Sequence, residues 1–92
     1  MKSISILGET YRLKLVSGLM ERDGLEGYVE PHSHTIYLDK ALKKNKRIFN
    51  RVLMHELCHC YAFESGLHEF LSAQALEMFC QTMAKVLCDL RL

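Results

Sequence analysis

The hydrophobic pattern of this chain changes its period near the middle, and the change limits the folds that the chain can adopt. Before Asn45, apolar and polar residues alternate, as in the segment 11–15, which is the period of a half-buried strand. After Asn45, apolar residues recur every three or four positions, as in an amphipathic helix. Strands followed by helices favour an α+β fold with a small, mainly antiparallel sheet of about three or four strands followed by two helices.

Two hairpins are predicted in the first half. Segments 4–6 and 11–15 lie on either side of a turn at Gly8, and segments 27–30 and 35–38 flank the turn Pro31-His32-Ser33-His34. We expect segment 35–38 to lie at an edge of the sheet, where unpaired backbone groups can pair with a peptide strand.

Two helices are predicted in the second half. Asn45 is a candidate N-cap for a helix of about 20 residues, which ends where Ser65-Gly66 supplies a stop signal. Ser72 can cap a second helix, which carries a broad apolar stripe from Leu76 to Leu90.

The chain length allows one hydrophobic core, so we expect residues 1–92 to form a single domain. Its four cysteines all lie in the second half, where a disulfide framework would leave the first half without a cross-link. We therefore expect reduced, packed cysteines and a cytoplasmic setting. No apolar run resembles a signal peptide or a membrane span, which agrees with this expectation.

The net charge is close to zero. Twelve Lys and Arg against 11 Asp and Glu give a charge of +1, which argues against a dedicated nucleic-acid or membrane binder. One local run is basic and contains no acid: Lys40, Lys43, Lys44, Lys46, Arg47 and Arg51. Such a run is usually a solvated face, although an acidic partner or a nucleic acid could dock on it.

The strongest chemical signal is the H-E-x-x-H run that extends from His55 to His59 in the first predicted helix. Histidines four positions apart on a helix lie about one turn apart on one face, so both imidazoles can bind a single zinc ion. Glu56 points about 100° round the helix, beside the ion and not at it. There its carboxylate could act as the general base that accepts a proton from an activated water.

A catalytic zinc site has three protein ligands and one open position, so a third ligand is needed. Helical rise places His59 about 9 Å before the end of the first helix and Glu77 about 7 Å after the start of the second. If the two helices ran antiparallel, these two residues would lie at about the same level. Glu77 also interrupts an apolar stripe, where an unpaired carboxylate is costly. Other candidates remain open at this stage: Glu64, His68 and Glu69.

The H-E-x-x-H motif followed by Glu77 resembles the gluzincin-type metallopeptidases, and in detail the small phage and mobile-element branch of the ImmA/IrrE-like proteins. The residues that carry the resemblance are Ile6-Leu7-Gly8, Tyr11, Gly27-Tyr28, segment 35–38, Met54-His55-Glu56-Leu57-Cys58-His59, segment 63–67 and segment 77–80. It implies one zinc ion held by His55, His59 and Glu77, a general base at Glu56, and an intracellular peptidase. Larger members carry additional helices, DNA-binding domains or sensor domains that this sequence does not contain.

Several other residues could assist such a reaction. His32 and His34 could stabilise a transition state if the second hairpin overhangs the zinc, and Tyr28 or Tyr37 could donate to an oxyanion. Histidines in a turn are more often solvated, and tyrosines in a strand more often pack against their neighbours. Tyr61 points away from the histidine face and is expected to be structural.

Two functions fit these observations. The first is a zinc metallopeptidase that acts on a protein or peptide substrate. The alternative is a protein-binding module, such as an antirepressor or host-factor binder, in which zinc stabilises the fold without catalysis. Glu56 distinguishes the two, because a structural site needs no carboxylate beside its metal ligands.

Overall fold

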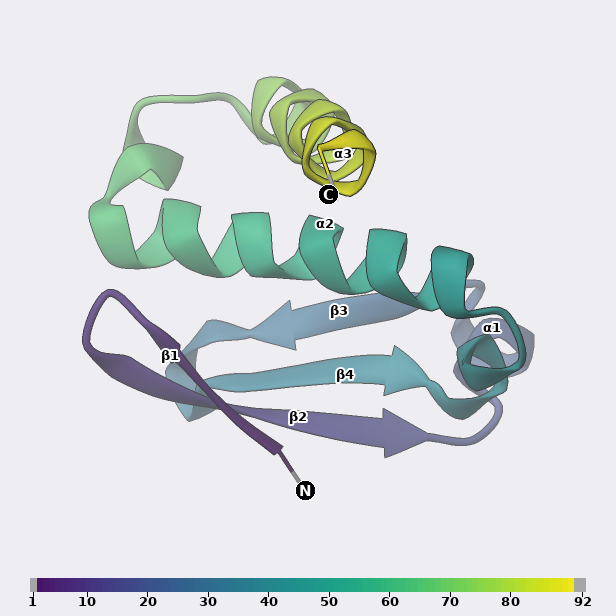
Figure 1. Ribbon diagram of the computed structural model, residues 1–92. Helices are drawn as coiled ribbons and strands as arrows, with labels where there is room; N and C mark the ends of the chain where they lie inside the picture. The colour runs from purple at the N-terminus through teal and green to yellow at the C-terminus, as the bar shows by residue number, and fades with distance from the viewer. Residues whose placement is uncertain (1, 91–92) are drawn as a thin grey trace.

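The computed structural model describes residues 2–90, which form a four-stranded sheet and the helices that follow it (Figure 1). The strands are β1 (Lys2–Ile6), β2 (Glu9–Val16), β3 (Gly27–Glu30) and β4 (Thr35–Asp39), in the spatial order β1-β2-β4-β3. β1 pairs with β2, and β3 with β4, in antiparallel fashion, while β2 and β4 are parallel. Both predicted hairpins and the α+β class are confirmed.

The expectation that segment 35–38 forms an edge of the sheet is wrong. β4 lies between β2 and β3, so the edges are β1 and β3. The physical reason is burial: Thr35, Ile36, Leu38 and Asp39 are buried in β4, whereas no residue of β3 is fully buried. A short strand that begins with Gly27 and is followed by Pro31 is typical of an edge, and this signal was available in the sequence.

Both predicted helices form, and side chains cap them where the sequence indicates. α2 (Lys46–Ser65) begins at Asn45, whose side chain accepts hydrogen bonds from the backbone N–H groups of Arg47 and Ile48. Gly66 ends α2 in the left-handed region with φ 83°. α3 (Ala73–Asp89) begins at Ser72, which accepts from the N–H of Ala75. α2 lies across the sheet, and α3 packs on the side of α2 that faces away from the sheet (Figure 1).

Four short helical segments were not predicted. They are α1 (Leu19–Asp23), η1 (Pro31–Ser33), η2 (Lys40–Lys44) and η3 (Leu67–Glu69). Elements of three to five residues are too short to show a hydrophobic period. Asp39 helps to fix two of them, because its carboxylate accepts hydrogen bonds from the N–H of Met20 in α1 and of Ala41 in η2.

The core lies between α2 and the inner face of the sheet. Its most deeply buried members have no exposed surface: Ile6, Tyr11, Ile36, Leu38 and Cys60. All four cysteines are free, and burial raises the pKa of the Cys60 and Cys80 thiols to about 12. These two thiols are therefore packing groups and not nucleophiles. No helix of the described residues is long and apolar enough to cross a membrane.

Candidate metal centre

His55 and His59 lie one turn apart on the same face of α2. Their Nε2 atoms are 3.2 Å apart, and the two ring centroids are separated by 5.0 Å. Both rings are mostly shielded, with 19% and 24% of the side-chain surface exposed. The helix therefore presents two imidazole nitrogens to one point in space, as the four-residue spacing predicts.

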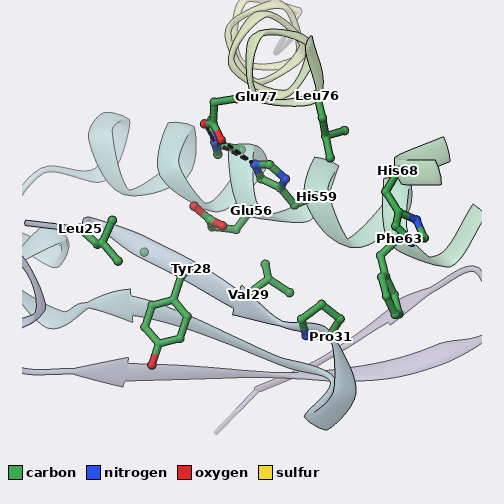
Figure 2. Close-up of a pocket in the computed structure, with 12 residues that line it drawn as sticks. Leu25, Tyr28, Val29, Pro31, Glu56, His59, Phe63, His68, Leu76 and Glu77 are labelled. Carbon is green, nitrogen blue, oxygen red and sulfur yellow. Dashed lines mark hydrogen bonds and ion pairs between the residues drawn. The ribbon is translucent and has the colours of Figure 1, made fainter. Parts of the chain in front are cut away.

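The third member of the group is Glu77, which comes from α3. Its Oε1 lies 2.6 Å from Nε2 of His55, and its Oε2 lies 3.3 Å from Nε2 of His59. Figure 2 shows the carboxylate directed down from α3 onto the His59 imidazole. The three ligand atoms lie within 4.8 Å of one another, so the group could hold one metal ion.

The two helices reach this arrangement by a different route from the one expected. They cross at a steep angle instead of running antiparallel (Figure 1). The connection from Gly66 to Ser72 contains η3 and redirects the chain over the top of α2. Glu77 lies near the start of α3, so it meets α2 at the crossing point, where His55 and His59 lie.

The other third-ligand candidates lie outside this group. His68 lines the same pocket, but its Nδ1 lies 3.3 Å from the Ala62 carbonyl oxygen and its ring packs against Phe63. Glu64 accepts a hydrogen bond from the Tyr11 hydroxyl. Glu69 is exposed at the end of η3. Among the described residues, only Glu77 joins the two histidines.

Glu56 lines the same pocket without belonging to the ligand group. Its carboxylate lies below the ligands, between α2 and β3 (Figure 2). Burial, together with the nearby carboxylates of Glu77 and Glu26, raises the pKa of Glu56 to about 7. Burial also lowers the pKa of His59, which favours the neutral imidazole that binds metals. The site thus combines three possible metal ligands with one carboxyl group, that of Glu56, which forms no ion pair within residues 2–90.

The pocket is a cleft of about 490 Å³ between α2, α3 and the edge strand β3. Apolar side chains form part of its wall, among them Leu25, Val29, Phe63 and Leu76. A site of this kind excludes bulk water from part of its surface and leaves an opening for a ligand.

Gly27 allows β3 to lie close to this site. A Cβ at Gly27 would lie 2.6 Å from Cδ2 of Leu38 and 2.8 Å from the Tyr37 carbonyl oxygen, and it would contact Cγ of Glu56 at 3.5 Å. Any larger residue would push the strand away from its neighbours. The sequence predicted a strand that begins at Gly27, but this close approach is a tertiary feature that no local pattern reveals.

The two turn histidines do not line the pocket. His34 stacks on Tyr11, with ring centroids 4.6 Å apart, and its Nε2 lies 3.5 Å from Oε2 of Glu64. His32 is exposed, with its ring at the edge of Phe63. The second hairpin therefore packs against the end of α2 and does not overhang the ligands with these two imidazoles.

The tyrosines also take packing positions. Tyr28 stacks on Tyr37 with ring centroids 4.7 Å apart, and Figure 2 shows the Tyr28 phenol directed to the far side of the sheet from the ligands. Tyr61 is 45% exposed. None of the three phenols points at the metal-ligand group.

Comparisons with family models, with curated proteins and with solved structures find no match to this chain. Inferences about function therefore rest on the geometry of the site itself.

Proposed function

We propose that this chain is a zinc-dependent metallopeptidase that hydrolyses a peptide bond. One observation carries the proposal: Glu56 lies in the same cleft as the group His55, His59 and Glu77, but is not part of it. Burying a carboxyl group without an ion-pair partner lowers the stability of the fold. A carboxyl group in this position, beside three metal ligands, is the general base that hydrolysis requires.

The donor set fits zinc. Two imidazoles and one carboxylate are the ligands of many catalytic zinc sites, and three protein ligands leave one coordination position open. When bound there, zinc would supply a Lewis acid that polarises a peptide carbonyl and makes a water molecule more acidic. His55, His59 and Glu77 would hold the ion. Glu56 would accept the proton of the attacking water and pass it to the leaving amine.

The edge strand β3 offers a place for an extended substrate. β3 pairs only with β4 in the described sheet, and Gly27, Tyr28 and Val29 all line the cleft. A peptide that paired with the free edge of β3 would extend the sheet and run past the metal ligands. This assignment replaces segment 35–38, which is central in the sheet and has no free edge.

The alternative is a zinc-stabilised binding module without catalysis. It is supported by the position of Glu77, the ligand that links α3 to α2. α3 packs on α2 and lies away from the sheet (Figure 1), so a shared ion would strengthen the packing of α3 on α2.

The variant Glu56→Gln separates the two functions. We expect it to keep its fold and zinc content but to lose about two or more orders of magnitude in hydrolysis, since general acid–base catalysis contributes about 10²–10⁴-fold. The assay is cleavage of a peptide library by zinc-loaded protein, with zinc measured in parallel. Glu69→Gln, exposed and outside the cleft, is the matched control. Equal cleavage by Glu56→Gln and wild type would remove Glu56 as the base, and an inactive wild type would favour the binding module.

A further inference from the structure

A second concave surface lies on the opposite flank of α2 from the metal centre. It is a groove of about 1050 Å³ between β1, β2, η2 and the first turns of α2. It shares no lining residue with the metal-site cleft. Whatever binds here would leave the metal centre open, so the two surfaces can serve different ligands.

The groove exists because one helix is too narrow to cover four strands. Strands are spaced about 4.8 Å apart, so the sheet is roughly 15–20 Å wide, whereas a helix has a diameter of about 10 Å. Of the two long helices that the structure describes, only α2 lies directly on the sheet, because α3 is stacked on the outer side of α2 (Figure 1). The inner face of β1 and β2 is therefore incompletely covered.

The floor of the groove is apolar. Five of the residues that line it are Ile4, Leu13, Leu15, Phe49 and Leu53. Leu13 is buried, and the other four are only partly buried although they pack against the core. Each would gain by further burial, at about 25 cal/mol for every Å² of apolar surface removed from water.

Lysines surround this apolar floor. They are Lys2, Lys40, Lys43 and Lys46, with Lys14 on the opposite face of β2 from Leu13 and Leu15, and no acidic residue among residues 2–90 lines the groove. In the described part of the chain every ion pair involves a histidine, so none of these five ammonium groups has a carboxylate partner. The groove is thus strongly positive although the net charge of the chain is only +1.

The structure also divides the basic run of the sequence into two parts. Lys40, Lys43 and Lys46 line the apolar groove, whereas Arg47 and Arg51 line a different hollow, together with Asp89. The run is therefore not one continuous cationic face.

We propose that this groove binds an acidic amphipathic helix of a partner protein. A helix is about as wide as the uncovered part of the sheet, and its apolar stripe would lie on the floor between the leucines and Phe49. Glutamates on both sides of the stripe would reach the lysines on the rim, which supplies charge complementarity. The helix would occupy the place of a second sheet-covering helix.

Two other ligand classes match the groove less well. Nucleic-acid phosphates would pair with the lysines but leave the apolar floor unburied. A membrane surface needs apolar side chains that protrude, whereas here the apolar residues are recessed and most of the lysines are exposed.

The test uses a fluorescein-labelled peptide of about 18 residues with leucines at helical i, i+3, i+4 and i+7 spacing, flanked by glutamates. Binding to the full chain is measured by fluorescence anisotropy. The variant pair Lys43→Glu with Lys46→Glu reverses two rim charges, and we expect it to weaken binding at least about tenfold. Acidic residues near the start of α2 also suit the helix dipole, so this variant should stay folded.

The matched control is Lys44→Glu with Arg47→Glu, which makes the same charge change in the same segment outside the groove. We expect this control to change the affinity for the peptide by less than about threefold. In the wild-type chain, the backbone amide chemical shifts that change on peptide binding should centre on Leu15, Phe49 and Leu53. Equal binding of a sequence-scrambled peptide, or equal losses in the two variant pairs, would overturn the proposal. A stronger interaction with duplex DNA, or a dimer that Lys43→Glu with Lys46→Glu abolishes, would also overturn it.

Discussion

One carboxylate, that of Glu77, contacts both histidines of the H-E-x-x-H helix, with Oε1 2.6 Å from Nε2 of His55 and Oε2 on the His59 side. The two helices cross at this point, so the contact joins the last element of the fold to the helix that covers the sheet. Three groups that could hold one metal ion thus meet where α3 packs on α2.

The first prediction concerns the third ligand. Glu77→Ala should lower zinc affinity by about a hundredfold or more, because loss of even an outer partner of a metal ligand typically costs roughly 10–100-fold. Competition with a chromophoric chelator measures the affinity. Glu69→Ala, which changes an exposed carboxylate on η3, should bind zinc as wild type does. Full affinity in Glu77→Ala with a loss in His68→Ala would transfer the assignment to His68.

The second prediction is that zinc raises the melting temperature. A ligand that binds only the folded chain at about 100 times its Kd adds about 2.7 kcal/mol, which in a domain of this size corresponds to a shift of roughly 10–20 °C. Differential scanning fluorimetry with added zinc, and then with excess EDTA, should show the rise and its reversal. The variant His55→Ala with His59→Ala should respond to neither, and an identical response would place the zinc elsewhere.

Local sequence signals were sufficient for the elements but not for their arrangement. The alternation in β2, the capping side chains of Asn45 and Ser72, and Gly66 each act within a few residues, so they predicted the hairpins and the helix bounds. The parallel pairing of β2 with β4 depends on contacts between distant segments. The alternating pattern does not encode this strand order, and the edge strand was assigned wrongly, although Pro31 after segment 27–30 is a local signal for an edge at β3.

The same distinction applies to the metal centre. The spacing of His55 and His59 is a property of one helix, so their convergence follows from the sequence. Glu77 was selected by an argument that assumed antiparallel helices, whereas the helices cross steeply. The contact between Tyr11 and Glu64 and the close approach at Gly27 had no sequence signal, because each joins elements that are distant in the chain.

The third prediction concerns the partly buried hydrogen bond from Tyr11 to Glu64. The hydroxyl of Tyr11, which has no exposed surface, donates to Oε2 of Glu64 over 2.6 Å. Burial and this hydrogen bond raise the pKa of the Tyr11 phenol, so it stays protonated as a donor. Tyr11→Phe should lower the free energy of unfolding by about 1.5–3 kcal/mol, the usual value for a hydrogen bond to a charged group. Urea denaturation measures it.

Tyr61→Phe is the control for that measurement, because Tyr61 lies on the outer face of α2 and is 45% exposed. Its effect should stay within about 0.5 kcal/mol, as for most surface substitutions. If Tyr11→Phe cost no more than Tyr61→Phe, the hydrogen bond would contribute nothing to stability.

The last prediction concerns acid stability and Asp39. Hydrogen bonds from the N–H groups of Met20 and Ala41, at 2.7 and 2.8 Å, lower the pKa of Asp39 in the folded chain. Because this pKa lies below the unfolded value of about 3.9, the contribution of Asp39 to stability is complete above that value and is lost as the pH falls through the folded pKa. Stability should therefore decrease in acid, partly through this one group.

Asp39→Asn isolates the effect, since the amide keeps one acceptor oxygen but carries no charge. At about pH 6 the variant should unfold at a lower urea concentration than wild type, and the difference should shrink by about pH 3, where the carboxyl group of the unfolded wild-type chain is mostly protonated. Urea midpoints at the two pH values measure this. Asp23→Asn, an exposed aspartate at the end of α1, should leave the midpoint at about pH 6 unchanged. A difference between Asp39→Asn and wild type that stays constant from about pH 6 to about pH 3 would show that the charge of Asp39 does not stabilise the junction of α1 and η2.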